Sequence, residues 1–191
     1  SVTRDGSTAW FVDSLDDACV IATDADPLSN PAEAEACTGD LIGLIASLAP
    51  QSSPTNKVFA GIGELGTRYS YGDIKSLLQG NVCVLEDRQG IRVVRGITTE
   101  GAAFAQITTR RIVDFAKAGI RQVANPFIGK LNNERVRKAL RGALDGFLTT
   151  MVVDEALTAY ELDVTATRAD EIAGRCVVNV AMQPTFSIDY I

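Results

Sequence analysis

The sequence contains no histidine, and its four cysteines form no Cys-x-x-Cys pair. Histidine is the commonest general base and a frequent zinc ligand, so its absence excludes Ser-His and Cys-His nucleophile pairs and most transition-metal sites. A mechanism based on a carboxylate or a lysine stays open but has no support in the sequence, so we expect no catalytic residue, metal or cofactor. We expect the cysteines to be reduced thiols in the core, because free cysteine behaves as a small buried hydrophobic residue. They are Cys19, Cys37, Cys83 and Cys176.

Long apolar runs are also lacking. No segment approaches the roughly 18 consecutive apolar residues of a membrane-spanning helix, and the amino-terminal segment lacks the basic and apolar regions of a signal peptide. We therefore expect a soluble protein without a membrane partner that is not secreted by the general route. With 191 residues, of which 46% are hydrophobic, the chain is long enough for one substantial core.

Acidic and basic side chains are unevenly distributed along the chain. Residues 1–50 hold one basic and nine acidic side chains, residues 110–141 hold nine basic and two acidic ones, and residues 142–191 hold two and eight. This asymmetry favours contact with an oppositely charged surface, such as nucleic acid, another protein or a neighbouring copy, although a solvated helix face explains it equally well. Few aromatic residues accompany the basic segment, so we expect no nucleic-acid partner.

Periodicity predicts interleaved helices and strands followed by a β-rich end. Residues 1–30 look irregular apart from a short strand at 18–22. We expect helices at 31–49, 71–79, 108–123 and 133–150, the last capped by Asn132 or Asn133. We expect strands at 57–60, 82–85, 91–97, 159–167, 175–183 and 186–191. This order predicts the α/β (α+β) class, with a mixed β-sheet flanked by helices.

Two of these helices carry clear apolar stripes, which we expect to face the core. In the helix at 108–123 the stripe consists of Ile112, Phe115, Ala116, Ile120 and Val123. In the helix at 133–150 it consists of Val136, Leu140, Ala143, Leu144, Phe147 and Met151.

One glycine motif suggests a different function. Residues 61–66 read Gly-Ile-Gly-Glu-Leu-Gly, and Glu86 follows at the spacing of a dinucleotide-binding fingerprint. That fingerprint requires a helix that begins within the glycines and binds the pyrophosphate at its N-terminus. Here the next residues, Thr-Arg-Tyr-Ser-Tyr-Gly, are typical of a loop. We interpret the glycines as backbone geometry and keep a nucleotide-binding oxidoreductase as the alternative function.

Four segments occur in the order found in one known protein family. They are GIRVVRGITT at 90–99, ITTRRIVDF at 107–115, FIGKLNNERVR at 127–137 and the β-rich carboxyl end. With the preceding helix that starts at Pro31, they resemble the carboxyl-terminal, tube-facing domain of the tail sheath proteins of contractile phages and contractile injection systems. The resemblance implies that residues 31–191 are this inner domain and that residues 1–30 are a remnant of an outer domain or a linker. It also implies that the chain is a fragment, because the family's amino-terminal arm and outer domains have no counterpart here.

The resemblance implies a structural subunit and not an enzyme. Sheath subunits stack as hexameric rings around a rigid tube, and contraction of the sheath drives the tube through a target envelope without a cofactor. The implied partners are other sheath subunits, the tail tube protein, and the baseplate and tail terminator proteins. The implied location is a virion tail or injection-system particle that is assembled in the cytoplasm of the producing cell.

Within this family the carboxyl end would join neighbouring subunits by β-augmentation. The strand before Pro184 is expected to be an inter-subunit sheet strand, formed by Val177, Val178, Asn179 and Val180. The segment after Pro184 is expected to be an inter-subunit arm, formed by Phe186, Ser187, Ile188, Asp189, Tyr190 and Ile191. The alternative is that both are strands of the chain's own sheet.

The basic side of the helix at 133–150, together with the loop before it, is a second candidate surface. Its members are Lys130, Arg135, Lys138 and Arg141. If the resemblance holds, these residues would face an acidic tube exterior through weak, salt-sensitive contacts. A solvated face and a contact between sheath subunits are the alternatives.

Overall fold

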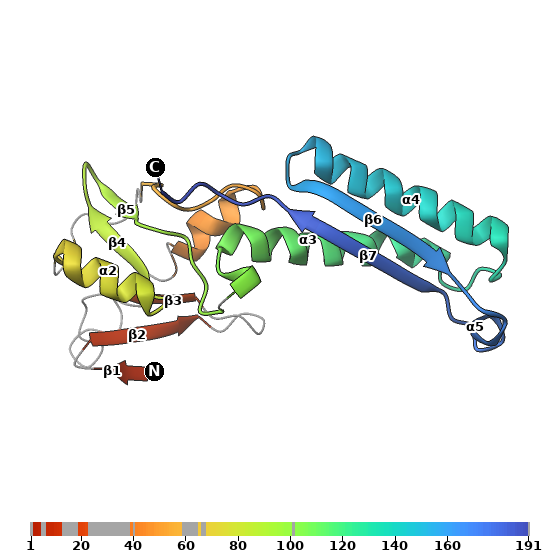
Figure 1. The fold of residues 1–191 in the computed structure, drawn as a ribbon, viewed down its shortest axis with the longest axis horizontal. Helices are drawn as coiled ribbons and strands as arrows, with labels where there is room; N and C mark the ends of the chain where they lie inside the picture. Colours follow the sequence, from red (N-terminus) through yellow and green to blue (C-terminus); the bar gives the residue numbers. More distant parts are fainter. Residues whose placement is uncertain are drawn as a thin grey trace. The chain divides into compact units, whose positions relative to one another are not determined.

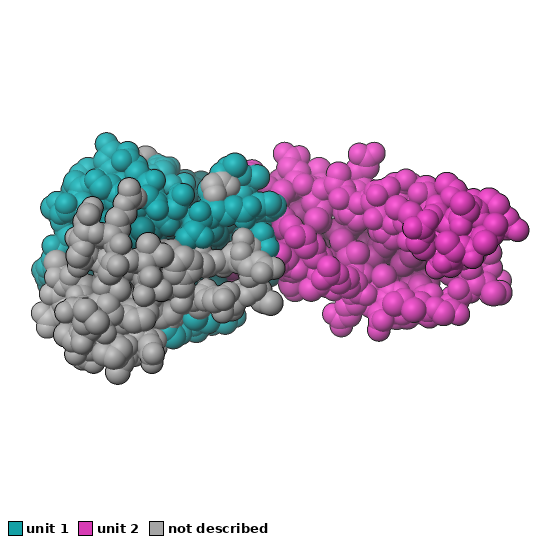
Figure 2. All heavy atoms as spheres, turned by 90° about the horizontal axis from the view of Figure 1, so that it is seen from below, with its two compact units in different colours: residues 1–110, 187–191 teal, residues 111–186 magenta. Residues whose placement is uncertain are grey.

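The computed structural model describes residues 2–4, 7–12, 19–22, 39, 41–58, 65, 68–100 and 102–190. The chain divides into two compact units, which Figure 2 shows in different colours: residues 1–110 with 187–191, and residues 111–186. The division falls inside one helix, α3 (Ile107–Ala124). The expected domain boundary at residue 31 stays a prediction.

The first unit contains a five-stranded sheet in the order β1-β2-β3-β4-β5 (Figure 1). Its strands are β1 (Val2–Arg4), β2 (Ser7–Val12), β3 (Cys19–Ala22), β4 (Cys83–Asp87) and β5 (Ile91–Val93). Strands β3 and β4 are parallel, whereas the other neighbouring pairs are antiparallel. The expected mixed sheet is therefore confirmed.

Strands β1 and β2 lie in a segment that the sequence analysis expected to be irregular, and that expectation is wrong. They pair as a hairpin in which Arg4 lies opposite Ser7. The two intervening sequence positions are Asp-Gly, a dipeptide typical of tight hairpin turns. Residues 7–12 read STAWFV and are rich in strand-forming residues. The many acidic residues in this part of the chain favoured an irregular segment over the hairpin that the Asp-Gly dipeptide and the strand-forming residues indicate.

The core of the first unit lies between the sheet and two helices. Residues 41–47 are helical, and α2 (Tyr71–Gln79) has the expected bounds. Ser70 and Asp73 form a capping box at the start of α2. The buried cluster consists of Leu41, Cys83, Leu85, Ile91, Val93 and Ile97. These are apolar positions of β4, β5 and the first helix, together with Ile97 after β5.

The second unit is a helical pair with a long β-hairpin (Figure 1). After α3 and a short 3-10 turn (Asn125–Phe127), α4 (Glu134–Val153) is followed by β6 (Leu157–Thr165), α5 (Arg168–Ile172) and β7 (Val177–Pro184). Asn133 caps α4 by accepting a hydrogen bond from the Val136 amide at 2.9 Å. The core consists of Ile112, Ala116, Leu140, Leu144, Leu148, Met151, Ala156, Leu157 and Leu162.

Three stripe residues differ from expectation. Phe115 is 49% exposed and Ala143 is also exposed, whereas Leu148, which the sequence analysis did not include, is fully buried. The apolar stripes are wider than the surface that the neighbouring elements cover, so their margins meet solvent. Phe115 instead lies beside Phe147, with 6.2 Å between the ring centroids.

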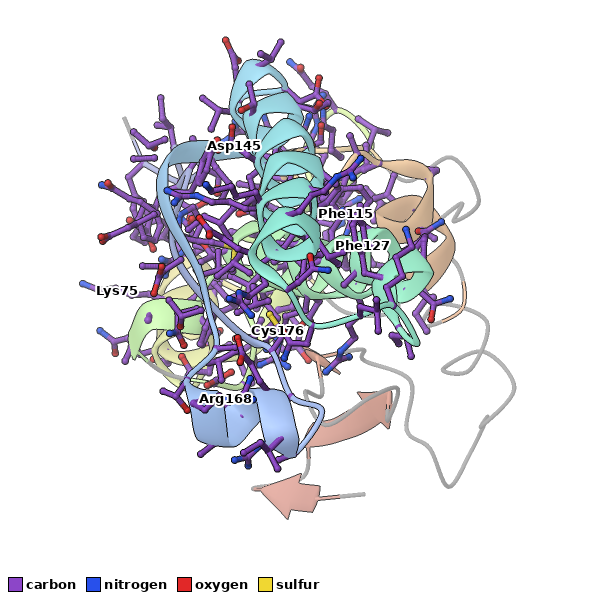
Figure 3. All side chains as sticks on the ribbon, turned by 90° about the vertical axis from the view of Figure 1, so that its right-hand side faces the viewer. Lys75, Phe115, Phe127, Asp145, Arg168 and Cys176 are labelled. Carbon is purple, nitrogen blue, oxygen red and sulfur yellow. The ribbon has the colours of Figure 1, made fainter. Side chains whose placement is uncertain are left out.

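The two described cysteine side chains differ in burial. Cys83 is buried, but Cys176 is exposed, so the expectation of a core thiol is wrong for Cys176. It lies between α5 and β7, at the end of the hairpin that carries Arg168 (Figure 3), where the chain turns away from the core. Cys19 and Cys37 are outside the described side chains. Across the described residues, no helix is long and apolar enough to cross a membrane, and no acidic or cysteine cluster is arranged to hold a metal.

Candidate functional site

The candidate inter-subunit strand lies in β7, and β7 pairs with β6 of the same chain. The register places Val164 opposite Val178, Asp163 opposite Asn179 and Leu162 opposite Val180. Pairing within the chain accounts for one edge of β7. The sheet has only these two strands in the part of the chain that the structure describes, so the outer edges of both strands have no strand partner there.

The two faces of this hairpin differ in character. Tyr160, Val164, Val178, Val180 and Met182 pack against the core of the second unit from one face. The residues between them point to the opposite side, where Val177 is 40% exposed. This alternation fixes the hairpin on α4 and leaves a free backbone edge, which is the geometry that accepts an added strand.

The candidate arm does not form a strand in this structure, so the expected strand at 186–191 is wrong for residues 186–190. Its side chains nevertheless alternate. Phe186, Ile188 and Tyr190 are 63%, 79% and 70% exposed, whereas Ser187 and Asp189 are less exposed and Asp189 forms an ion pair with Arg95. Ile191 lies outside the described residues. The segment is extended, but it is held by hydrogen bonds from side chains of the first unit and not by the backbone hydrogen bonds of a β-sheet.

Asp189 anchors this segment through a nearly buried carboxylate. Its side chain is 3% exposed, and Oδ2 lies 2.8 Å from the Arg95 Nε donor and 2.8 Å from the Gln106 Nε2 donor. The hydroxyls of Thr55 and Ser187 donate to Oδ1 at 3.3 and 3.2 Å. A charge-assisted set of this kind is stronger than neutral hydrogen bonds, and it satisfies both carboxylate oxygens.

The Gln106 side chain forms hydrogen bonds with the backbone of the same segment. Its Oε1 accepts a hydrogen bond from the Ser187 amide at 3.0 Å, and its Nε2 donates to the Ser187 carbonyl, also at 3.0 Å. The Arg95 guanidinium lies 5.1 Å from the centroid of the Tyr190 ring. Thr55, Arg95 and Gln106 were not among the residues predicted from the sequence. No local pattern marks them, because they are 134, 94 and 83 positions away from Asp189.

The predicted basic surface is exposed on α4 and the loop before it. Lys138 forms an i,i+4 ion pair with Glu134 at 2.7 Å, and the same lysine holds the pKa of Glu134 below its usual value. Lys130 lies 4.5 Å from the centroid of the Phe127 ring. The structure therefore presents Arg135 and Arg141 as exposed cations, while Glu134 offsets part of the charge of Lys138.

Another arginine of α4 has a structural role. Arg137 donates to Glu171 of α5 at 3.0 Å and to the Asn132 side-chain oxygen at 2.9 Å, and Asn132 in turn donates to the Arg175 carbonyl at 2.8 Å. Hydrogen bonds from Arg168 and then Arg137 lower the pKa of Glu171 from its ordinary 4.5. The resulting stabilisation is present above that ordinary value and is lost as the pH falls through the lowered pKa.

The glycine motif at 61–66 lies outside the described residues except for Leu65. Helix α2 begins at Tyr71, after the loop-like residues that follow the motif. No helix start within the glycines is described, so the structure provides no support for a dinucleotide site.

One known protein family matches the carboxyl-terminal part of the chain. Residues 99–191 match the family described as the phage tail sheath C-terminal domain. No match was found among the curated proteins.

Solved structures with a similar fold include three sheath proteins. The anti-feeding prophage helical sheath in its contracted state superposes with a TM-score of 0.72 at 20% identity, over 81% of this chain and 47% of the other. The PVC sheath complex of an extracellular contractile injection system, also contracted, gives 0.71 at 17% identity, over 78% and 46%. The sheath tail protein from Desulfitobacterium hafniense gives 0.62 at 16% identity, over 95% and 44%. The chain thus spans less than half the length of each of these proteins.

Proposed function

We propose that the chain is part of a structural subunit of a contractile tail sheath, because residues 99–191 match the family described as the phage tail sheath C-terminal domain. The subunit polymerises around a rigid tube and transmits force by changing its packing. The proposed role is mechanical and requires no cofactor or catalytic residue. The family match carries this proposal, and the fold shared with three sheath proteins supports it. Neither comparison favours the nucleotide-binding alternative.

The β6–β7 hairpin is the proposed site of subunit joining. Its outer edge at Val177–Val180 offers backbone groups to a strand from a neighbouring subunit, and the segment Phe186–Ile191 is the proposed donor. Each backbone hydrogen bond contributes about 0.5–1.5 kcal/mol, so one joint is modest but a lattice of joints is strong. A donor at one place and an acceptor at another make a heterologous contact, which propagates as an open helix or closes as a ring.

The proposed particle contains further partners. The subunits form stacked rings around a tail tube protein, with baseplate and terminator proteins at the ends, in a virion tail or injection-system particle assembled in the cytoplasm. A chain in the structure of the anti-feeding prophage baseplate also has a similar fold. This likeness supports an assembly role at the level of the particle.

Deletion of the residues after Gln183 tests the joining role. In the complete protein that contains this chain, we expect electron microscopy to show striated tubes, and the deletion to abolish them because it removes the strand donor. Helices α3 and α4 and all of the hairpin except Pro184 lie before the deletion, so the far-UV circular dichroism spectrum is expected to stay close to that of the undeleted protein. Tubes that still form without this segment would show that it is not the donor.

A double charge reversal tests the basic surface. We propose that Arg135 and Arg141, with Lys130 and Lys138, face an acidic tube exterior in the extended sheath. Single exposed pairs contribute about 0.2–1 kcal/mol, so Arg135→Glu with Arg141→Glu is expected to weaken co-sedimentation with purified tubes by about tenfold at low salt. The two glutamines at the same positions are the control for charge removal without reversal. Binding that responds to neither substitution nor salt contradicts a tube contact.

A further inference from the structure

The strongest unassigned feature is the set of groups around Asp189 in the first unit. Thr55, Arg95 and Gln106 come from three separate parts of the chain and converge on residues 187–189. The Thr55 hydroxyl also accepts a hydrogen bond from the Gly96 amide at 3.0 Å, which fixes its orientation. The fold of the first unit thus orients the Thr55 hydroxyl, and it places the side chains of Arg95 and Gln106 within hydrogen-bond distance of residues 187–189.

These contacts select an extended backbone and a carboxylate. The Gln106 amide pairs with the Ser187 backbone at both its oxygen and its nitrogen, a pairing that requires an extended peptide. The Arg95 guanidinium and the same Gln106 nitrogen then require an anion two residues later. Asparagine in place of Asp189 would remove the negative charge and oppose at least one donor with its own amide group.

Apolar burial contributes little to the docking. Phe186, Ile188 and Tyr190 remain mostly exposed. A cavity of about 520 Å³ also stays open beside Asp189 and Tyr190, against Tyr71, Ile74 and Leu78 of the first unit. A segment that is held by polar contacts and keeps its apolar side chains in solvent loses little buried area when it leaves. Exchange for an identical segment restores the same contacts.

We propose that Thr55, Arg95 and Gln106 form a peptide-binding site for an extended segment that carries a carboxylate, and that its ligand is the carboxyl-terminal segment of this chain or of a second copy. In this structure the chain's own segment occupies the site. The site is distinct from the hairpin edge of the proposed function, so the segment has two alternative docking places. While the chain's own segment is bound at this site, the segment is not available to pair with the hairpin of a neighbouring subunit.

The first experiment measures release. In the full chain, Asp189→Ala is expected to raise the hydrogen-exchange rate of the Ser187 amide at least tenfold, because the amide's bond to Gln106 depends on docking. The Val180 amide on β7 is the internal control and is expected to exchange at its original rate. A Ser187 amide that exchanges at the same rate in both proteins overturns the proposal.

The second experiment measures binding in trans. The probe is the amidated peptide TFSIDYI, residues 185–191, titrated into the isotope-labelled Asp189→Ala chain. Saturable shifts of the Gln106 side-chain amide and the Gly96 amide are expected, with at least tenfold weaker binding of TFSINYI. In the chain carrying Gln106→Ala as well as Asp189→Ala, the Gly96 shifts are expected to disappear.

Equal binding of the two peptides, or no shift at millimolar peptide, overturns the proposal. Neither measurement requires a sheath. Peptide binding by a protein that never forms tubes would therefore reject only the proposed function. Tubes formed by a protein that ignores the peptide would reject only this site.

Discussion

Leu148→Ala is expected to lower the free energy of unfolding of the unit formed by residues 111–186 by about 3 kcal/mol, because it removes a fully buried side chain and leaves a cavity. Leu148 lies on α4 between Leu144 and Met151, and its neighbours in the core come from α3, α4 and β6. The cavity is bounded by a helix pair and a hairpin whose backbones cannot collapse fully onto it. Urea unfolding followed by circular dichroism measures the change.

Arg141→Ala is the matched control on the same helix. Its side chain is exposed, and loss of an exposed side chain typically changes stability by less than about 0.5 kcal/mol. Similar losses for the two variants would mean that the core position of Leu148 has been assigned incorrectly. A change in the slope of the urea dependence would indicate that the two units unfold separately.

Gly119→Leu is expected to destabilise the same unit by about 3 kcal/mol through overpacking. Gly119 lies in α3 directly under the ring of Phe147, and a Cβ atom at this position would come within 2.1 Å of Phe147 Cζ and within 2.7 Å of two further ring atoms. The ring cannot move freely, because it packs against the core and beside Phe115. Thermal and urea unfolding measure the loss.

Two variants separate this close contact from a general effect of glycine replacement. Gly142→Ala lies in the interior of α4 with no atom near the added Cβ, so it is expected to stabilise the helix by about 0.5–1 kcal/mol. Phe147→Ala combined with Gly119→Leu is expected to cost less than the sum of the two single changes, since loss of the ring removes the clash and the leucine side chain fills part of the space that the ring leaves. Strict additivity would contradict the packing explanation.

Strand β7 and the carboxyl-terminal segment that follows it are held in place by different kinds of contact. Strand β7 and the segment after it are adjacent in sequence, yet they behave differently: β7 is bound by a backbone ladder to β6, whereas residues 187–189 are bound by side chains of the first unit. The alternation of polar and apolar residues is similar in the two. A period of two indicates an extended chain, but it does not specify which groups satisfy its backbone.

Several features followed from the sequence because their causes are local. The bounds of α2 follow from its capping box and its apolar spacing. The start of α4 follows from the Asn133 cap, and the buried positions Leu140, Leu144 and Met151 follow from a 3.6-residue period. The order of four short segments was enough to indicate the sheath family, which the family match confirms. The hairpin of β1 and β2 was missed although its Asp-Gly signal is also local.

Only the tertiary structure decided the pairing of distant groups. The sequence predicts a mixed sheet, but it does not reveal that β3 lies parallel to β4 across some sixty intervening residues. Nor does it show which margins of the apolar stripes, such as Phe115, stay in solvent. The anchor of Asp189 on Arg95 and Gln106 has the same origin: such contacts depend on where the folded backbone places each side chain, and no periodicity or spacing along the chain records that. The sequence thus determined the local elements and the family, and the three-dimensional fold determined the site that holds the carboxyl-terminal segment.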